Sequence, residues 1–174
     1  MNRWIVALAT CLLLVAGAFA LAPRVQAPPA AAEGWRAFTA TWSVTGQQQM
    51  LPTEGGRAAA TAQLSGAVVL ATGDGLSRGF RGDYIGFDDG RALTVGRWVW
   101  TDEHGNQIFG EMRGEPVQTG RRSAATITGG SGRYAGVSGT YQFHWQYVVE
   151  AEDGTIQGRT TGLEGRYRFG GGQP

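Results

Sequence analysis

Residues Ile127–Gly139 read ITGGSGRYAGVSG, and the interpretation of this stretch decides the fold class. Gly130, Gly132 and Ala135 satisfy the G-x-G-x-x-G/A pattern with which dinucleotide-binding folds cradle a phosphate. That function needs a helix directly after the glycines, because the helix N-terminus supplies the phosphate site. The residues that follow instead alternate between apolar and polar side chains as far as Glu150, with the period of a strand. No nucleotide site is therefore predicted.

The segment Gly139–Glu150 is the clearest strand in the sequence. Its odd positions carry the aromatic residues Tyr141, Phe143, Trp145 and Tyr147, and polar residues occupy most of the even positions. Four exposed aromatic rings on one face would make a large apolar patch on the surface. The aromatic face is therefore expected to point into the protein.

The rest of the chain after Trp35 also has the pattern of an all-β protein. Apolar residues alternate with polar ones, and Asp-Gly or Gly-Asn turn dipeptides separate the segments. Strands joined by such turns are typical of antiparallel hairpins. The predicted strands are Arg36–Gly46, Ala58–Thr72, Gly79–Asp88, Arg91–Thr101, Asn106–Gly114, Ser123–Thr128, Gly139–Glu150 and Thr155–Phe169.

Eight antiparallel strands in a chain of this length either close into a barrel or form a sandwich. Glycines within the predicted strands favour the barrel, because they permit tight bends and bulges. An eight-stranded barrel has room for core side chains or for one small ligand. The predicted fold is an all-β, eight-stranded antiparallel β-barrel, with a β-sandwich as the alternative.

The opening stretch also resembles a motif of one barrel family. TGGSGRY from Thr128, followed by AGVSG, looks like the GGTG-[KR]-[FY] segment and small-residue turn of dirigent proteins and allene oxide cyclase-like barrels, with Ser131 in place of the commoner threonine. The resemblance covers roughly Ala67–Phe169. It implies an eight-stranded antiparallel barrel with a central apolar cavity. Members of the family guide cyclisation or coupling of small hydrophobic molecules, often without a cofactor.

The N-terminus has the features of a secretory signal: a short basic start, then an apolar run from Trp4 to Ala22. An uncleaved membrane anchor is the alternative, since about 19 apolar residues can span a bilayer. The protein is accordingly predicted to be exported, either periplasmic or secreted. The predicted organisation is a signal peptide at 1–27, a linker at 28–34, the barrel domain at 35–170 and a flexible tail at 171–174.

Composition excludes several kinds of chemistry. All 15 basic residues are arginine, which excludes Schiff-base and P-loop lysines. The single cysteine, Cys11, lies in the apolar N-terminal run, so the domain has no disulfide and no thiol nucleophile. Arginine and acidic residues are nearly equal in number, so the net charge is close to zero and does not favour binding of nucleic acid. His104 and His144 lack a spaced third ligand, so no metal site and no cofactor are predicted.

The candidates for a ligand-binding wall are the aromatic residues expected inside the barrel. Ligand cavities are mostly apolar with a few placed polar groups, and tyrosines supply both a ring and a hydroxyl. The alternative interpretation of the same residues is ordinary core packing. The candidate residues are Phe38, Trp42, Tyr141, Phe143, Trp145 and Tyr147.

Arg97 and Glu111 are the candidate catalytic residues. The hairpin centred near His104 should place them opposite each other on neighbouring strands. Outside the barrel such a pair is an ordinary surface ion pair worth little. Inside it, an arginine-paired carboxylate would orient a polar substrate group or transfer a proton. Both placements are left open.

Three functions are consistent with this sequence. The preferred hypothesis is an exported barrel that binds a small hydrophobic molecule in its central cavity. The second is a cofactor-free cyclase or isomerase that uses the same cavity, and the third is a structural or interaction protein with a filled barrel. Contact with a membrane is expected only through the N-terminal segment, and a homo-oligomer is left open.

Overall fold

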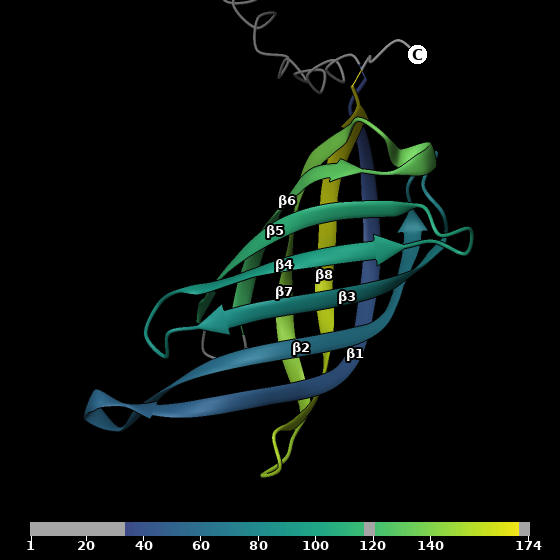
Figure 1. The fold of residues 1–174 in the computed structure, drawn as a ribbon. Helices are drawn as coiled ribbons and strands as arrows, with labels where there is room; N and C mark the ends of the chain where they lie inside the picture. Colours follow the sequence, from purple (N-terminus) through teal and green to yellow (C-terminus); the bar gives the residue numbers. More distant parts are fainter. Residues whose placement is uncertain (1–33, 117–120, 171–174) are drawn as a thin grey trace, which may run out of the picture. The chain divides into compact units, whose positions relative to one another are not determined.

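The chain forms a closed barrel of eight antiparallel strands, in which each strand pairs with its neighbours in sequence and β1 pairs with β8 (Figure 1). The computed structural model describes residues 34–116 and 121–170. Two short 3₁₀ turns, η1 (Glu54–Gly56) and η2 (Gly132–Tyr134), connect β1 to β2 and β6 to β7. The strands are β1 (Arg36–Thr53), β2 (Arg57–Thr72), β3 (Gly79–Asp88), β4 (Thr94–Thr101), β5 (Gln107–Pro116), β6 (Arg121–Gly130), β7 (Val137–Glu150) and β8 (Thr155–Phe169).

The predicted barrel is confirmed, and the sandwich alternative is wrong because β1 and β8 pair and leave a single closed sheet. β3 and β8 have the predicted bounds. β1 continues past Gly46 to Thr53, because β2 remains paired with it up to the η1 turn. The predicted signal segment, nearly all of the predicted linker and the predicted tail lie outside the described residues. Within the described ranges, no helix has the length and apolar character needed to cross a membrane.

The barrel interior contains aromatic rings that lie directly against glycines of neighbouring strands. A Cβ atom at Gly110 would lie 2.1 Å from Cζ2 of Trp98, and one at Gly158 would lie 2.1 Å from Cζ2 of Trp145. The Tyr84 ring occupies the space beside Gly96 in the same way. These glycines are therefore required for space, since any side chain at these positions would overlap a ring.

The opening stretch closes one end of the barrel. A register shift between β5 and β6 leaves Thr128 as an extra residue, and η2 then turns the chain into β7. The glycines of this stretch thus form a bulge and a tight turn. Gly132 adopts a φ of 57°, and a side chain there would also collide with Asn106. Tyr134 is completely buried below the turn, with its ring 5.7 Å from the ring of Phe80.

Asp102 joins the turns of this closed end through hydrogen bonds. Its Oδ1 accepts the backbone N–H groups of His104 and Asn106, both at 2.9 Å, and its Oδ2 accepts the Tyr134 hydroxyl at 3.0 Å. The N–H of Ser77 in turn donates to the Tyr134 oxygen at 3.2 Å. Burial raises the pKa of Asp102, but the hydrogen bonds from Asn106, His104 and Tyr134 outweigh it and lower the pKa to about 2.

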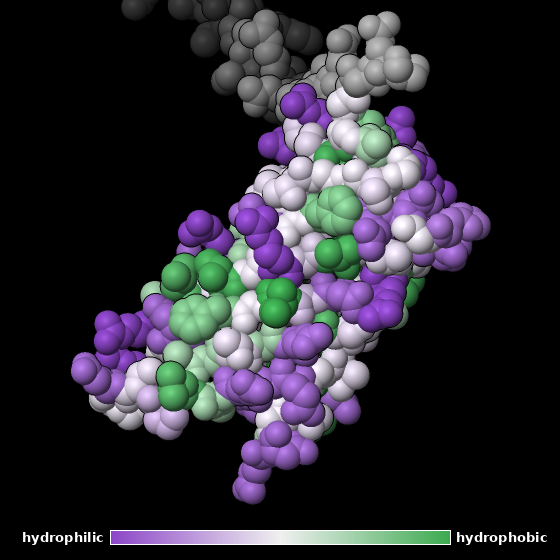
Figure 2. Space-filling view, viewed as in Figure 1, coloured by the Kyte–Doolittle hydropathy of each residue, from purple (hydrophilic) through white to green (hydrophobic). Residues whose placement is uncertain are grey.

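The opposite end of the barrel is more open. β1 pairs with β8 only as far as Gln47 and β2 pairs with β3 only from Ala60, so the hairpin between them projects past the barrel wall (Figure 1). Met50 and Leu51 on this hairpin are exposed. Figure 2 shows that apolar side chains also gather on the outer face toward this end, where Phe87 and Leu93 are exposed.

We expect Gly110→Ala to lower the free energy of unfolding by about 1–3 kcal/mol, the usual cost of overpacking a core. The added methyl group would meet both the Trp98 ring and the carbonyl oxygen of Thr126. Gly129→Ala is the matched control on the neighbouring strand, because nothing lies within 4 Å of a Cβ there. Urea denaturation followed by tryptophan fluorescence measures both, and equal stability of the two variants would contradict the packing argument.

Asp102→Asn should destabilise the barrel by roughly 2 kcal/mol at pH 7, the scale of hydrogen bonds to a charged group. Because the folded pKa of Asp102 lies below its unfolded value, its stabilising contribution is complete above about pH 4 and is lost as the pH falls toward 2. The stability difference between the wild type and the variant should therefore shrink over that interval. Thermal unfolding at pH 2, 3, 4 and 7 tests this, and a difference independent of pH would refute the role of the carboxylate.

Candidate functional site

A cavity of about 260 Å³ opens at the end of the barrel opposite η2. Its deeper wall is apolar and comes from Trp42, Leu64, Phe143, Trp145 and Ile156. Inward-facing alanines of β2 leave the space between these side chains and the mouth unfilled. These alanines are Ala58, Ala60 and Ala62.

A polar cluster lies on the opposite side of the mouth. Arg121 forms an ion pair with Asp88 and donates from Nη1 to the Thr94 hydroxyl at 2.8 Å. The Thr94 hydroxyl donates to Asp88 Oδ2 at 3.0 Å, and the N–H of Gly90 donates to Asp88 Oδ1 at 2.7 Å. The Arg121 and Asp88 side chains are only 24% and 16% exposed. Their positive and negative charges cancel, so the cluster is polar without a net charge.

The register of four neighbouring strands, β3 to β6, brings this cluster together. Asp88 at the end of β3 pairs directly with Thr94 at the start of β4. Thr94 is the cross-strand partner of Gly114 on β5, and Gly114 is the cross-strand partner of Ser123 on β6. Gly114 leaves room between Thr94 and Ser123, since a Cβ there would lie 3.3 Å from each, and Arg121 lies two residues from Ser123 on β6, opposite Pro116.

Tyr84 lies between the polar cluster and the apolar wall. Its hydroxyl sits over Gly86, where a Cβ atom would lie within 1.8 Å of the oxygen. Burial, and to a lesser degree the nearby Tyr147 and Asp88, raise the pKa of Tyr84 to about 12, against the opposing effect of Arg121. The phenol is therefore protonated at any physiological pH. No hydrogen-bond partner for this hydroxyl lies within the described residues, which makes it a donor available to a bound molecule.

Trp42 supplies a second polar group without a partner. Its Nε1–H is buried next to Gly82 and Val68 and finds no acceptor among the described residues. An unsatisfied buried donor costs free energy unless something accepts its hydrogen bond. The residue lies in the wall of the same cavity as Tyr84.

The six predicted ligand-wall residues divide into two groups. Trp42, Phe143, Trp145 and Tyr147 line the mouth cavity, but Tyr147 is 41% exposed because it lies beyond the last pair of β7 with β6, which joins Trp145 and Arg121. The expectation that the Tyr147 ring is buried is therefore wrong.

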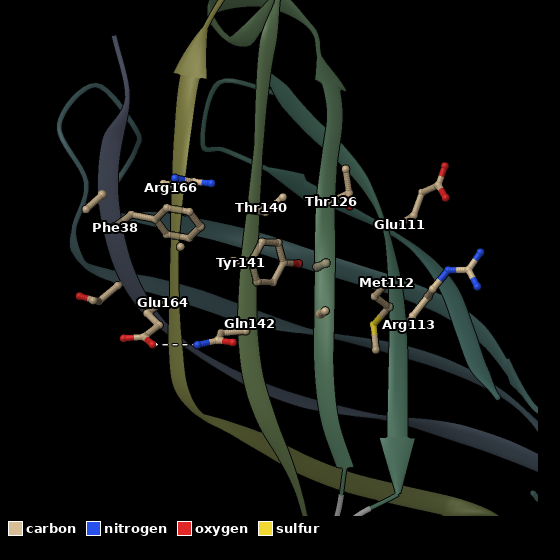
Figure 3. Close-up of a pocket in the computed structure, with 15 residues that line it drawn as sticks. Phe38, Glu111, Met112, Arg113, Thr126, Thr140, Tyr141, Gln142, Glu164 and Arg166 are labelled. Atoms are coloured by element: carbon tan, nitrogen blue, oxygen red, sulfur yellow. Dashed lines mark hydrogen bonds between the residues drawn. The ribbon is translucent and has the colours of Figure 1, made fainter. Parts of the chain in front are cut away.

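Phe38 and Tyr141 are buried with ring centroids 6.0 Å apart and do not line the mouth cavity. They lie beneath a shallow groove on the outer face of the sheet (Figure 3).

Arg97 and Glu111 meet as the register predicted: they are direct partners on β4 and β5, with an Nη1–Oε1 distance of 2.7 Å. Their side chains are 69% and 47% exposed, so the pair lies on the outer surface. The interior placement, which would have made them a proton-transfer pair in a cavity, does not occur. His104 and His144 are also exposed.

Asp88, Thr94, Arg121 and Tyr84 were not among the sequence-based candidates. The signal that identifies them is position within each strand. Asp88 has the same parity as the buried Tyr84, and the even residues of β3 point inward. Arg121 likewise has the parity of the inward-facing residues of β6. A charged residue on the inward side of a barrel strand is the pattern to look for.

No family model matches the chain, and no curated protein matches it. The structure is similar to that of a pterocarpan synthase dirigent protein, with a TM-score of 0.42 and 11% sequence identity, over 78% of this chain and 92% of that one. At this identity the likeness concerns the fold alone. The eight-stranded antiparallel barrel that the dirigent resemblance implied is present in the structure itself.

Arg121→Met should lower the free energy of unfolding by about 2–3 kcal/mol, because it leaves the Asp88 carboxylate largely buried without its cation. The double variant Asp88→Asn/Arg121→Met should be more stable than Arg121→Met alone, since it removes the unpaired charge. Thermal unfolding of both variants and the wild type measures this. A double variant less stable than the single one would show that the two charges do not depend on each other.

Proposed function

We propose that this protein binds a small, predominantly hydrophobic and uncharged molecule in the mouth cavity. The observation that carries the proposal is the cavity itself, in which an apolar aromatic wall faces a small set of oriented polar groups. This combination is the usual composition of a small-molecule site. The rest of the interior is filled with side chains, so the mouth is where a ligand fits.

The polar groups define the ligand's chemistry. Arg121 is already neutralised by Asp88, so a carboxylate on the ligand would compete with Asp88 and leave one negative charge unpaired. The Tyr84 hydroxyl lines the cavity without a hydrogen-bond partner among the described residues and can donate to a ligand, whereas the unpartnered Nε1–H of Trp42 is fully buried. A ligand with one hydroxyl or carbonyl oxygen matches these groups better than a charged one. Export of the protein is part of the proposal and rests on the N-terminal sequence alone.

A series of naphthalene probes tests this ligand class. We expect 2-naphthol to bind more tightly than naphthalene, because its hydroxyl can bond to Tyr84, and more tightly than 2-naphthoate, because the carboxylate is repelled by Asp88. Hydrogen bonds of this kind contribute about 1 kcal/mol, which is roughly a fivefold difference in Kd. Quenching of tryptophan fluorescence measures all three affinities, and Tyr84→Phe should abolish the advantage of 2-naphthol over naphthalene.

The location of binding is tested by filling the cavity. Ala62→Trp places an indole inside the mouth and should abolish binding of 2-naphthol. Ala67→Trp is the matched control, because Ala67 lies on the same strand but is exposed and outside the cavity. Equal affinity of the two variants, or unaltered binding in Ala62→Trp, would place the ligand elsewhere. Native mass spectrometry of protein purified from its own cells then identifies the natural ligand.

A cofactor-free cyclase or isomerase is the second candidate. The specific observation in its favour is that a protonated phenol, Tyr84, and a carboxylate, Asp88, face the same cavity, which is the pairing that acid–base catalysis requires. Once a natural ligand is identified, catalysis predicts that its conversion fails in Asp88→Asn while binding persists. A ligand recovered unchanged after incubation with the wild type would reject this candidate.

A further inference from the structure

The outer face of the barrel over β5–β8 carries a charge pattern that the mouth cavity does not use. A groove of about 660 Å³ runs over this face. Its floor consists of short side chains, among them Ala124, Thr126 and Thr140. Long charged side chains lie on β5 and β8, with Glu111 and Arg113 on β5 and Glu164 and Arg166 on β8 (Figure 3). Beyond β8 the groove continues to Ala37 and Thr39 of β1.

Strand register arranges these residues in two rows across the sheet. The first row runs Glu111, Thr126, Thr140, Arg166, in which each residue is the direct partner of the next. The second row runs Arg113, Ala124, Gln142, Glu164 in the same way. Each row therefore has opposite charges at its two ends. The first row is negative on β5 and positive on β8, and the second row is positive on β5 and negative on β8.

The charges at the two ends of a row cannot meet within one chain. β5 and β8 are three strand spacings apart, which is roughly 14 Å, and side chains on the outside of a barrel diverge. Among the described residues, no carboxylate lies within 4.0 Å of Arg113 or Arg166. Glu164 accepts only a hydrogen bond from Gln142, at 3.0 Å. Glu111 is paired with Arg97 of β4 at 2.7 Å, so Arg113, Arg166 and Glu164 are the groove charges without an ion-pair partner among the described residues.

We propose that this groove face binds the same face of a second copy of the chain, about a two-fold axis that runs between β6 and β7 parallel to the strands. This rotation exchanges the two sides of the groove. Arg113 of one copy then faces Glu164 of the other, and Glu111 faces Arg166. All four charged positions meet an opposite charge, which is the self-complementarity that an isologous dimer requires.

The shape of the face suits this arrangement. Thr126 and Thr140 lie on either side of the axis, and with Ala124 they let the two sheets approach. Packed sheets lie about 10 Å apart, a gap that an arginine and a glutamate can bridge together. The mouth cavity opens at the end of the barrel and not on this face, so dimerisation leaves it accessible and does not depend on the proposed ligand.

Charge reversal followed by sedimentation equilibrium tests the proposal on the full chain purified from its own cells. Arg113→Glu and Glu164→Arg each place like charges opposite each other twice per dimer. Either should raise the dimer Kd at least about tenfold. The double variant Arg113→Glu/Glu164→Arg restores opposite charges and should return the Kd to within about threefold of the wild type. Arg159→Glu, an exposed position of β8 outside the groove, is the matched control and should leave the Kd unchanged.

The wild type's own salt dependence provides a second measurement that needs no variant. The dimer should weaken between 50 mM and 1 M NaCl, because salt screens exposed ion pairs. A protein that remains monomeric at about 100 μM, where even weak protein pairs associate, would overturn the proposal. A dimer whose Kd does not change with salt would also overturn it. The same holds if neither single reversal raises the dimer Kd, or if the double variant fails to recover the wild-type Kd.

Discussion

The inside of a closed eight-stranded barrel is too narrow for a large side chain on every strand. This chain meets the limit by placing glycine next to the rings, as with Gly110 beside Trp98 and Gly158 beside Trp145. The aromatic rings then fill the interior without forcing the strands apart. Closure of the sheet and the packing of its core are therefore two aspects of one constraint, which accounts for the glycines beside the interior rings.

The same constraint explains why the two ends of the barrel differ. At one end, Tyr134 fills the interior and is held by Asp102, so the chain folds back over a closed core. At the other end, β2 presents alanines where other strands present rings, and a space remains. Polar residues that would be too costly in a filled core are tolerated there, because Asp88 and Arg121 satisfy each other and keep part of their contact with solvent.

Several features of this structure could be predicted because they depend on local pattern. The alternation in β7 predicted which of its aromatic residues point inward. Tyr147 also lines the mouth cavity but is exposed, because it lies beyond the last pair of β7 with β6. The partnership of Arg97 and Glu111 followed from counting residues about one hairpin. Whether that pair lay inside or outside was not predictable from the hairpin, since pairing alone does not say which face of the sheet turns inward.

The amino-acid sequence was sufficient for the strands and most of their turns, because alternation and turn residues act over a few positions. It favoured a barrel but left a sandwich open, and the pairing of β1 with β8 in the tertiary structure decided between them. The sequence was not sufficient for the candidate site. Asp88, Thr94 and Arg121 come from three strands, β3, β4 and β6, and they meet although β5 lies between the second and the third. Contacts between strands that are not neighbours in sequence depend on the curvature of the closed sheet, and that curvature exists only when the whole barrel has formed.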